Sequence, residues 1–229
     1  MREIFKQEMQ ELGESLVTMA GHVATAIEQA ATALKVADLT LAEQVIDADN
    51  AIDALENKID DLGISLLARQ APVATDLRVV VSGLQLSATL ERMGDLARHL
   101  AYVARGRYPE PAVSGPMKDI LDKMGAQATK VGTQVHQLLE TRDMNLAAAV
   151  EQEDEILDAL HRDSFQVVLD DSQELTRQEI VDSVLLGRYL ERFGDHGVSV
   201  ARRISYLVTG DTSNAVRVPH ESAPSDEAR

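Results

Sequence analysis

Hydrophobic side chains along most of this chain recur three and four positions apart, which is the period of an amphipathic helix. One such stripe runs from Leu41 to Leu66, and another runs from Leu86 to Ala104. The spacing predicts an all-α protein of six helices. Their expected ranges are 3–36, 40–69, 75–105, 116–141, 145–171 and 175–208.

Local signals mark where several of these helices should begin. Thr40 followed by Glu43, and Thr176 followed by Glu179, both fit a capping box, in which each side chain bonds the other residue's backbone N–H. Pro116 suits the first position of a helix, where no amide donor is needed.

The two halves of the chain repeat each other. Leu90–Asp95 reappears as Leu190–Asp195 with one substitution, at an offset of 100. Upstream positions align at an offset of 105: Asp38, Leu41, Asp49, Asp53, Ala54 and Leu55 match Asp143, Leu146, Asp154, Asp158, Ala159 and Leu160. The change of offset predicts that the connection between the second and third helices is five residues shorter in the second half. An internal duplication follows, with two tandem three-helix bundles.

Composition places the boundaries of these units. Three of the six prolines fall within residues 106–116, which indicates a linker. From residue 209 onward the chain is rich in Gly, Ser, Asn, Pro and charge without an apolar period, which predicts a disordered tail. The expected division is a first three-helix repeat at 1–108, a Pro-rich linker at 109–116, a second repeat at 117–208 and a disordered C-terminal tail at 209–229.

The overall charge narrows the range of partners. The chain has 22 Lys and Arg against 38 Asp and Glu, a formal charge of −16. Such a surface repels phosphate backbones and anionic lipid headgroups, so we expect no nucleic-acid partner and favour cations or basic protein surfaces. The absence of cysteine excludes disulfides, thiolate zinc sites, iron–sulfur clusters and a cysteine nucleophile.

The sequence predicts a cytoplasmic protein without direct membrane insertion. Residues 1–8 alternate charged and apolar side chains and contain no signal-peptide core. The longest stretch free of acidic and basic side chains runs from Ser15 to Ile27, well short of the roughly 20 apolar residues that a spanning helix needs.

Acidic side chains form a narrow row on the second predicted helix. The row consists of Asp49, Asp53, Glu56 and Asp60, and no basic residue interrupts it. Like charges four residues apart destabilise a helix by roughly 0.2–0.5 kcal/mol per pair, so the row favours binding of a counter-cation.

The third predicted helix brings further acids to the same level. Glu91 and Asp95 are four residues apart, and His99 follows one turn later. An antiparallel hairpin centred near residue 71 or 72 sets Glu91 and Asp95 level with Asp49 and Asp53. Four carboxylates from two helices are therefore expected to face one another.

The second half repeats this construction. Its hairpin is centred near residue 173, which sets Glu191 and Asp195 close to the level of Asp154 and Asp158. His161, three residues after Asp158, also has ligand spacing on a helix.

A glycine in the middle of the third helix of each repeat supports the same picture. Gly94 and Gly194 each lie between two acids, where a glycine costs roughly 1 kcal/mol relative to alanine. Losing the side chain there would let the neighbouring helix come close enough for the carboxylates to share an ion.

We therefore predict one metal site, mononuclear or polynuclear, in each half. Oxygen donors with one or two imidazoles suit Fe, Mn, Zn, Mg or Ca, and the sequence does not discriminate among them. The candidate ligands are Asp49, Asp53, Glu56, Glu91, Asp95, His99, Asp154, Asp158, His161, Glu191 and Asp195. The alternative is that these acids form solvated faces, with Arg98 and Arg202 supplying ordinary ion pairs.

These motifs resemble a known family. A duplicated three-helix unit with D-x-x-x-D on the middle helix, D-L-R opening the third helix, and E-R-x-G-D within it is similar to the PhoU family of phosphate-uptake regulators, over about residues 1–208. The resemblance implies two three-helix bundles, a homodimer, and multinuclear clusters of Fe, Zn, Mn or Mg at the acidic motifs.

The resemblance also implies a function. It points to a non-enzymatic, cytoplasmic negative regulator of phosphate uptake and phosphate-starvation signalling, acting as an adaptor between the ATPase of the phosphate ABC transporter and a sensor histidine kinase. The alternatives are a carboxylate-bridged metalloenzyme or metal-storage helical bundle, and a helical scaffold whose acidic faces are merely solvated. Glu-x-x-His on two helices, as a di-iron oxidase would need, does not occur in the predicted helices.

Overall fold

The computed structural model describes residues 2–210, which form six helices. They are α1 (Arg2–Val36), α2 (Leu39–Gln70), α3 (Ala74–Arg107), α4 (Gly115–Thr141), α5 (Met144–Leu169) and α6 (Arg177–Thr209). Every predicted helix end agrees within two residues, and the described part of the chain contains no strand, so the all-α prediction is confirmed. Thr209 still belongs to α6 and Gly210 caps it, whereas the rest of the predicted tail lies outside the described residues.

The helix starts follow one capping prediction and contradict another. The capping box at α6 is confirmed, because the Glu179 N–H donates to Thr176 Oγ1 at 3.2 Å and the Thr176 N–H donates to the Glu179 carboxylate at 2.9 Å. The box at Thr40 is wrong, because the carboxylate of Asp38 accepts from the Leu41 N–H at 2.9 Å and starts α2 earlier. Thr40 is therefore already inside the helix.

The five-residue difference between the repeats lies in the helices, so the expected shorter connection is also wrong. Three residues, 71–73, join α2 to α3, whereas seven, 170–176, join α5 to α6. The second repeat is shorter because α5 ends early and α6 starts late. Asp170 explains the early end of α5: its carboxylate accepts from the Ser172 N–H at 2.9 Å, a local turn that competes with helix continuation.

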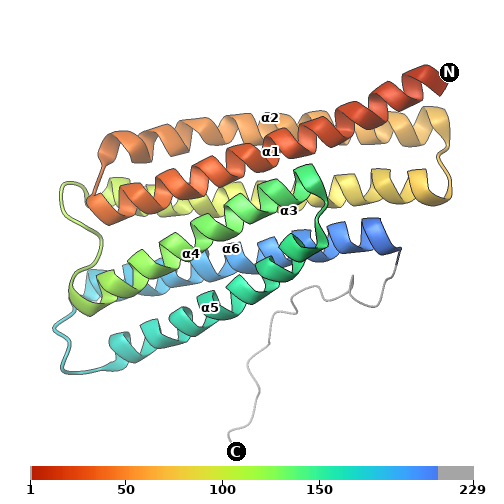
Figure 1. The fold of residues 1–229 in the computed structure, drawn as a ribbon. Coiled ribbons are helices and arrows are strands. Elements are labelled where there is room, and N and C mark those ends of the chain that lie inside the picture. Colours follow the sequence, from red (N-terminus) through yellow and green to blue (C-terminus); the bar gives the residue numbers. More distant parts are fainter. Residues whose placement is uncertain (1, 211–229) are drawn as a thin grey trace, which may run out of the picture.

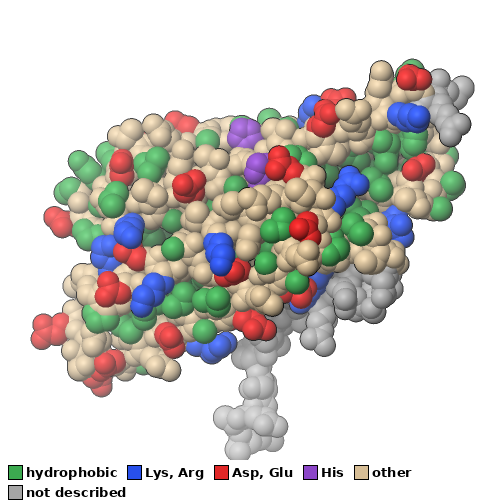
Figure 2. Space-filling model, viewed as in Figure 1, with side chains coloured by type: hydrophobic (Ala, Val, Ile, Leu, Met, Phe, Trp, Pro, Cys, Tyr) green, Lys and Arg blue, Asp and Glu red, His purple; other side chains and the backbone are tan. Residues whose placement is uncertain are grey.

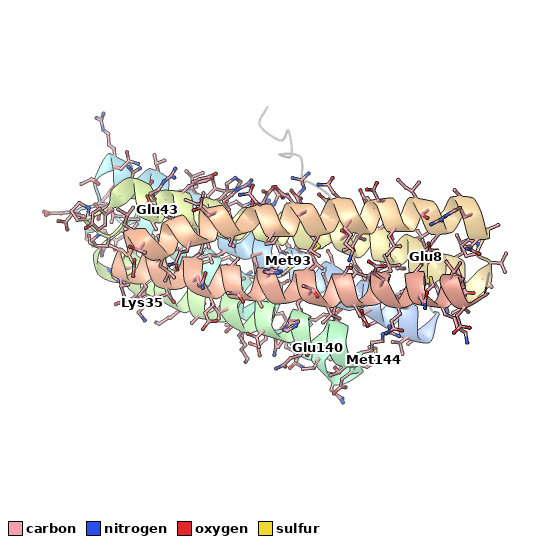
Figure 3. All side chains as sticks on the ribbon, turned by 90° about the horizontal axis from the view of Figure 1, so that it is seen from above. Glu8, Lys35, Glu43, Met93, Glu140 and Met144 are labelled. Atoms are coloured by element: carbon pink, nitrogen blue, oxygen red, sulfur yellow. The ribbon has the colours of Figure 1, made fainter. Side chains whose placement is uncertain are left out.

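The helices form two layers. Helices α2, α3, α6 and α5 lie side by side in that order, since α2 contacts α3, α3 contacts α6, and α6 contacts α5. Helix α1 packs on α2 and α3, helix α4 packs on α5 and α6, and α1 also contacts α4. Figure 1 shows α1 and α4 on the viewer's side of the other helices, and the view from above in Figure 3 agrees. Each half is thus a three-helix bundle joined to the other through two helix pairs.

A single hydrophobic core runs through all six helices. Alanine, leucine and valine make up most of it, and Phe193 and Met93 are fully buried. Figure 3 labels Met93 between the ribbons of α1 and α2. Small residues let the two bundles approach, since a Cβ atom on Gly125 of α4 would lie 3.1 Å from Ala31 Cβ of α1.

The outer face of α1 and α4 has no patch of a single charge. Figure 2 shows acidic, basic and hydrophobic side chains interspersed over this face. None of the helices within residues 2–210 is long and apolar enough to cross a lipid bilayer.

An ion pair between a half-buried arginine and a buried carboxylate joins the two repeats at the end of α3. Arg107 Nε and Nη2 donate to the two carboxylate oxygens of Asp182 on α6 at 2.5 and 3.0 Å. Asp182 is 3% exposed and also accepts from Gln178 at 3.1 Å. The fork of two bonds fixes the register of α3 against α6.

Replacing Arg107 with alanine should destabilise the fold by about 1–3 kcal/mol, because it leaves the buried Asp182 carboxylate without its cation. Chemical denaturation would measure the loss. Lys123→Ala, at an exposed lysine with no ion pair among the described residues, is the control and should change stability by less than about 0.5 kcal/mol. Equal effects of the two substitutions would contradict the role of the pair.

Candidate metal centres

The middle and third helices of each repeat run antiparallel and come very close at the predicted glycines. A Cβ atom on Gly94 would lie 2.8 Å from Ile52 Cδ1 and 3.4 Å from an oxygen of Asp49. A Cβ atom on Gly194 would lie 2.8 Å from Leu157 Cδ2 and would overlap a carboxylate oxygen of Asp154. The prediction that these glycines permit close approach is confirmed, and the acids of the two helices do lie at one level.

The side chain of Arg98 bridges two acids of the first cluster. The Arg98 guanidinium pairs with Asp49 of α2 through Nη1 and with Asp95 of α3 through Nη2. Asp49 is 5% exposed, and burial raises its pKa although Arg98 opposes the shift. The alternative that Arg98 makes an ordinary ion pair is therefore partly right. It predicted partners on the helix of Arg98, whereas one of the two carboxylates, Asp49, lies on the neighbouring helix.

Two further acids belong to this cluster. Burial, and then the charge of Asp95, raise the pKa of Glu91 to about 7, although Arg92 lies 3.5 Å from its carboxylate and lowers the pKa. Burial, followed by the charges of Asp60 and Asp53, raises the pKa of Glu56. The structure thus brings Glu56 to the cluster that the sequence predicted.

The second cluster has the same acids but a different balance of charge. Burial, followed by the charges of Asp158, Asp195 and Glu191, raises the pKa of Asp154 to about 7. Asp154 Oδ1 is buried and has no hydrogen-bond partner among the described residues. Four carboxylates therefore lie close enough to act on one another, and one oxygen is left unsatisfied.

In the described part of the chain, only one of these four carboxylates has an arginine within ion-pair distance. Arg188 lies 2.7 Å from Glu191, whereas within residues 2–210 no lysine or arginine is within ion-pair distance of Asp154, Asp158 or Asp195. Arg202 lies 3.4 Å from Glu151 instead. Its charge nevertheless lowers the pKa of Asp154 and of Asp195, against the larger effect of burial.

The two candidate histidines lie at the edges of the clusters. The His99 ring packs against Tyr189 of α6, with ring centroids 5.1 Å apart, and its Nδ1 is buried without a hydrogen-bond partner among the described residues. The His161 ring lies beside Gly187 and Phe165, and its Nε2 is likewise buried and unpaired in the described part of the chain. Burial and the charge of Arg188 lower the pKa of His161, and Asp158 partly opposes this. His161 is thus electrostatically connected to its cluster, whereas His99 faces the other repeat.

The carboxylates are not arranged as a finished metal site. As they stand in residues 2–210, no three Asp, Glu or His side chains surround a common point closely enough to hold an ion. The metal sites therefore stay a prediction. The second cluster fits a cation through its unsatisfied oxygen and its hard donors, whereas in the first a guanidinium already holds two of the donors.

Sequence reasoning missed one partly buried group between the repeats. His196 of α6 has its pKa lowered to about 4 by burial, followed by the charges of Arg192 and Arg92. Arg92 of α3 and Arg192 of α6 occupy equivalent positions of the duplicated hexapeptide. Because α3 and α6 contact each other, the repeat could have indicated that His196, four residues after Arg192, lies near both arginines.

These features define a class: a helical protein built from a duplicated three-helix unit, with an acidic cluster on the same two helices of each copy. The family model described as the PhoU domain matches the chain twice, over residues 16–104 and 121–204. The chain belongs to the PhoU family.

Similar proteins agree over almost the whole chain. A protein of Mycobacterium tuberculosis named phosphate-specific transport system accessory protein PhoU homolog 2 is 40% identical over 92% of this chain and 99% of its own length. The Mycobacterium leprae protein named PhoU homolog 1 is 38% identical over 96% of this chain and 99% of its own length.

Solved structures show the same fold. The crystal structure of PhoU from Pseudomonas aeruginosa superposes with a TM-score of 0.83 at 30% identity, covering 90% of this chain and all of that one. The phosphate transport system regulatory protein PhoU from Streptococcus pneumoniae gives a TM-score of 0.77 at 25% identity, covering 93% of this chain and all of that one.

Gly194→Ala should destabilise the fold by about 1–3 kcal/mol, because the new methyl group meets Leu157 and the Asp154 carboxylate. Gly13→Ala is the matched control: a Cβ there meets nothing within 4 Å, and alanine should add up to about 1 kcal/mol of helix stability. Thermal unfolding of both variants tests this pair. A Gly194→Ala protein as stable as the Gly13→Ala protein would show that the close approach is not needed.

In a chelating buffer, stability should fall as pH rises from 5 to 8. The pKa of Asp154 is raised to about 7 from an ordinary value of 3.8, so the folded state holds a proton that the unfolded state has released. Stability from this group is therefore present at low pH and is lost as pH rises through about 7.

Melting temperatures of the wild type, Asp154→Asn and Asp163→Asn, measured at each pH unit, would check this prediction. Asp163 is an exposed acid on the same helix, and its variant should follow the wild-type slope. The Asp154→Asn curve should be flatter, and three parallel curves would refute the assignment.

Proposed function

We propose that this chain is a non-enzymatic regulatory accessory protein of phosphate-specific transport. In this role it lowers phosphate import and keeps phosphate-starvation signalling off when phosphate is plentiful. The observation that carries the proposal is the 40% identity, over nearly the full length of both chains, to a protein named as an accessory of that transport system.

The partners that we propose are a second copy of this chain, the ATPase of the phosphate ABC transporter and a sensor histidine kinase of the phosphate regulon. In this proposal the chain is an adaptor that works in the cytoplasm. Its support is the named role of the relatives together with a formal charge of −16, which suits basic protein surfaces.

Deleting the gene in its native host should raise phosphate uptake and derepress starvation genes in phosphate-rich medium. Labelled phosphate uptake and a starvation-promoter reporter would measure both, and expression of the intact chain should restore repression. The host should carry no other copy of the gene, since a second copy would mask the loss. Unchanged uptake and reporter activity in such a host would refute the proposed role.

We further propose that metal ions neutralise the acidic clusters. In the second repeat the holding residues would be Asp154, Asp158, Glu191 and Asp195, with His161 at the edge. A bound cation would supply positive charge between α5 and α6, brace the two helices and shape the surface offered to a partner. The unsatisfied Asp154 oxygen and the raised pKa values of Asp154, Glu191 and Asp195, each caused first by burial, support this proposal.

Metal analysis of the purified protein before and after chelation would test it. We expect bound metal that chelation removes, and a lower melting temperature afterwards, because a ligand that binds only the folded state stabilises it. Asp158→Asn should reduce both the metal content and the melting shift, while the exposed-site variant Asp163→Asn should leave both unchanged. No bound metal and no melting shift would remove the metal from the account and would leave the regulatory proposal standing.

A further inference from the structure

We infer that the two acidic clusters are not equivalent, because Arg98 fills the first cluster with a cation carried by the chain itself, and only the second cluster readily takes up a metal ion. This inference deepens the proposed metal sites and rests on them. It concerns which cluster binds metal and which residue decides it.

The first observation is the position of the Arg98 side chain. Its two terminal nitrogens pair with carboxylates on two different helices, Asp49 of α2 and Asp95 of α3. A metal ion shared by the two helices would have to use these same oxygens. The guanidinium is a fixed fork that stays charged at any pH the protein meets, so it neutralises both acids permanently.

The second observation is the number of arginines that each cluster engages. In the first repeat Arg92 adds contacts to Glu91 at 3.5 Å and to Asp95 at 3.3 Å, so three carboxylates have arginine partners. In the second repeat, as described above, Glu191 alone has one. The carboxylates of the first cluster therefore have more ion pairs with arginine than the equivalent carboxylates of the second cluster.

The arginines near the two clusters differ at three aligned positions, since Arg188 and Arg202 of α6 align with Ala88 and Tyr102 of α3. Of the arginines at these positions, only Arg98 pairs with carboxylates of one cluster on two different helices. The offset of 100 that aligns α3 with α6 pairs Arg98 with Val198. Val198 is 6% exposed and has no group that can neutralise a carboxylate. Removing Arg98 should therefore free Asp49 and Asp95 for a metal ion, and an arginine at position 198 should neutralise acids of the second cluster.

The test measures Mn²⁺ binding to the full chain, freed of metal beforehand, by electron paramagnetic resonance of the free ion. Asp53→Asn marks the first cluster and Asp158→Asn marks the second. In the wild-type background, Asp158→Asn should remove most of the binding and Asp53→Asn should change it little. We expect at least about tenfold tighter binding at the second cluster than at the first.

The arginine exchange gives the second half of the test. Arg98→Val should add Mn²⁺ binding that Asp53→Asn then abolishes, and Val198→Arg should remove the binding that depends on Asp158. Circular dichroism melts show whether each variant folds. If Arg98→Val fails to fold, the wild-type comparison of Asp53→Asn with Asp158→Asn still decides the question.

The outcomes are distinguishable. Equal losses from Asp53→Asn and Asp158→Asn would overturn the inference while the proposed metal sites stand. Binding that is insensitive to both variants would overturn it as an adventitious surface effect. No binding in any folded variant would overturn the inference together with the metal proposal.

Discussion

Carboxylates held on adjoining helices repel one another in each repeat, and the fold has to offset this repulsion. Each repeat places acids from its middle and third helices at one level, next to a core that removes them partly from water. A glycine on the third helix makes this possible, since any side chain at Gly94 or Gly194 would meet the opposite helix. The cost of gathering like charges must be offset by protons, by arginine or by a bound cation.

The two repeats meet this requirement in different ways. The first uses Arg98, which joins α2 to α3 through two charged contacts. The second leaves Asp154 with an unsatisfied oxygen and with a pKa raised to about 7. Duplication preserved the acids and the glycine, whereas the arginines around them differ between the repeats. The regulatory role that we propose would then be built on two similar bundles with different responses to metal.

Much of this could be predicted from the sequence, for physical reasons. Helical period and strong repeats determine where the helices lie, because hydrophobic faces must be buried, and the level of the acids follows from hairpin geometry. The prediction at Thr40 was wrong because Asp38, two residues earlier, competes for the same role. The length of the connection was wrong because Asp170 ends α5 by a local turn, which alignment offsets do not reveal.

The side chains that decide the balance of charge were harder to foresee. From the sequence, Arg98 could have paired only with Asp95 on its own helix. The packing of α2 against α3 shows that it also reaches Asp49 on the neighbouring helix. His99 has suitable spacing for a ligand, yet its ring lies against Tyr189 because α6 packs on that side of α3. Both outcomes depend on which helix becomes a neighbour, and periodicity alone does not contain that information.

Anomalous diffraction from crystals soaked in Mn²⁺ would show which acidic cluster holds the ion. We expect a strong peak between α5 and α6, within reach of Asp154, Asp158 and Asp195, and a weak peak or none beside Arg98. Carboxylates of the second repeat that point away from one another into solvent, with no peak between them, would contradict this expectation.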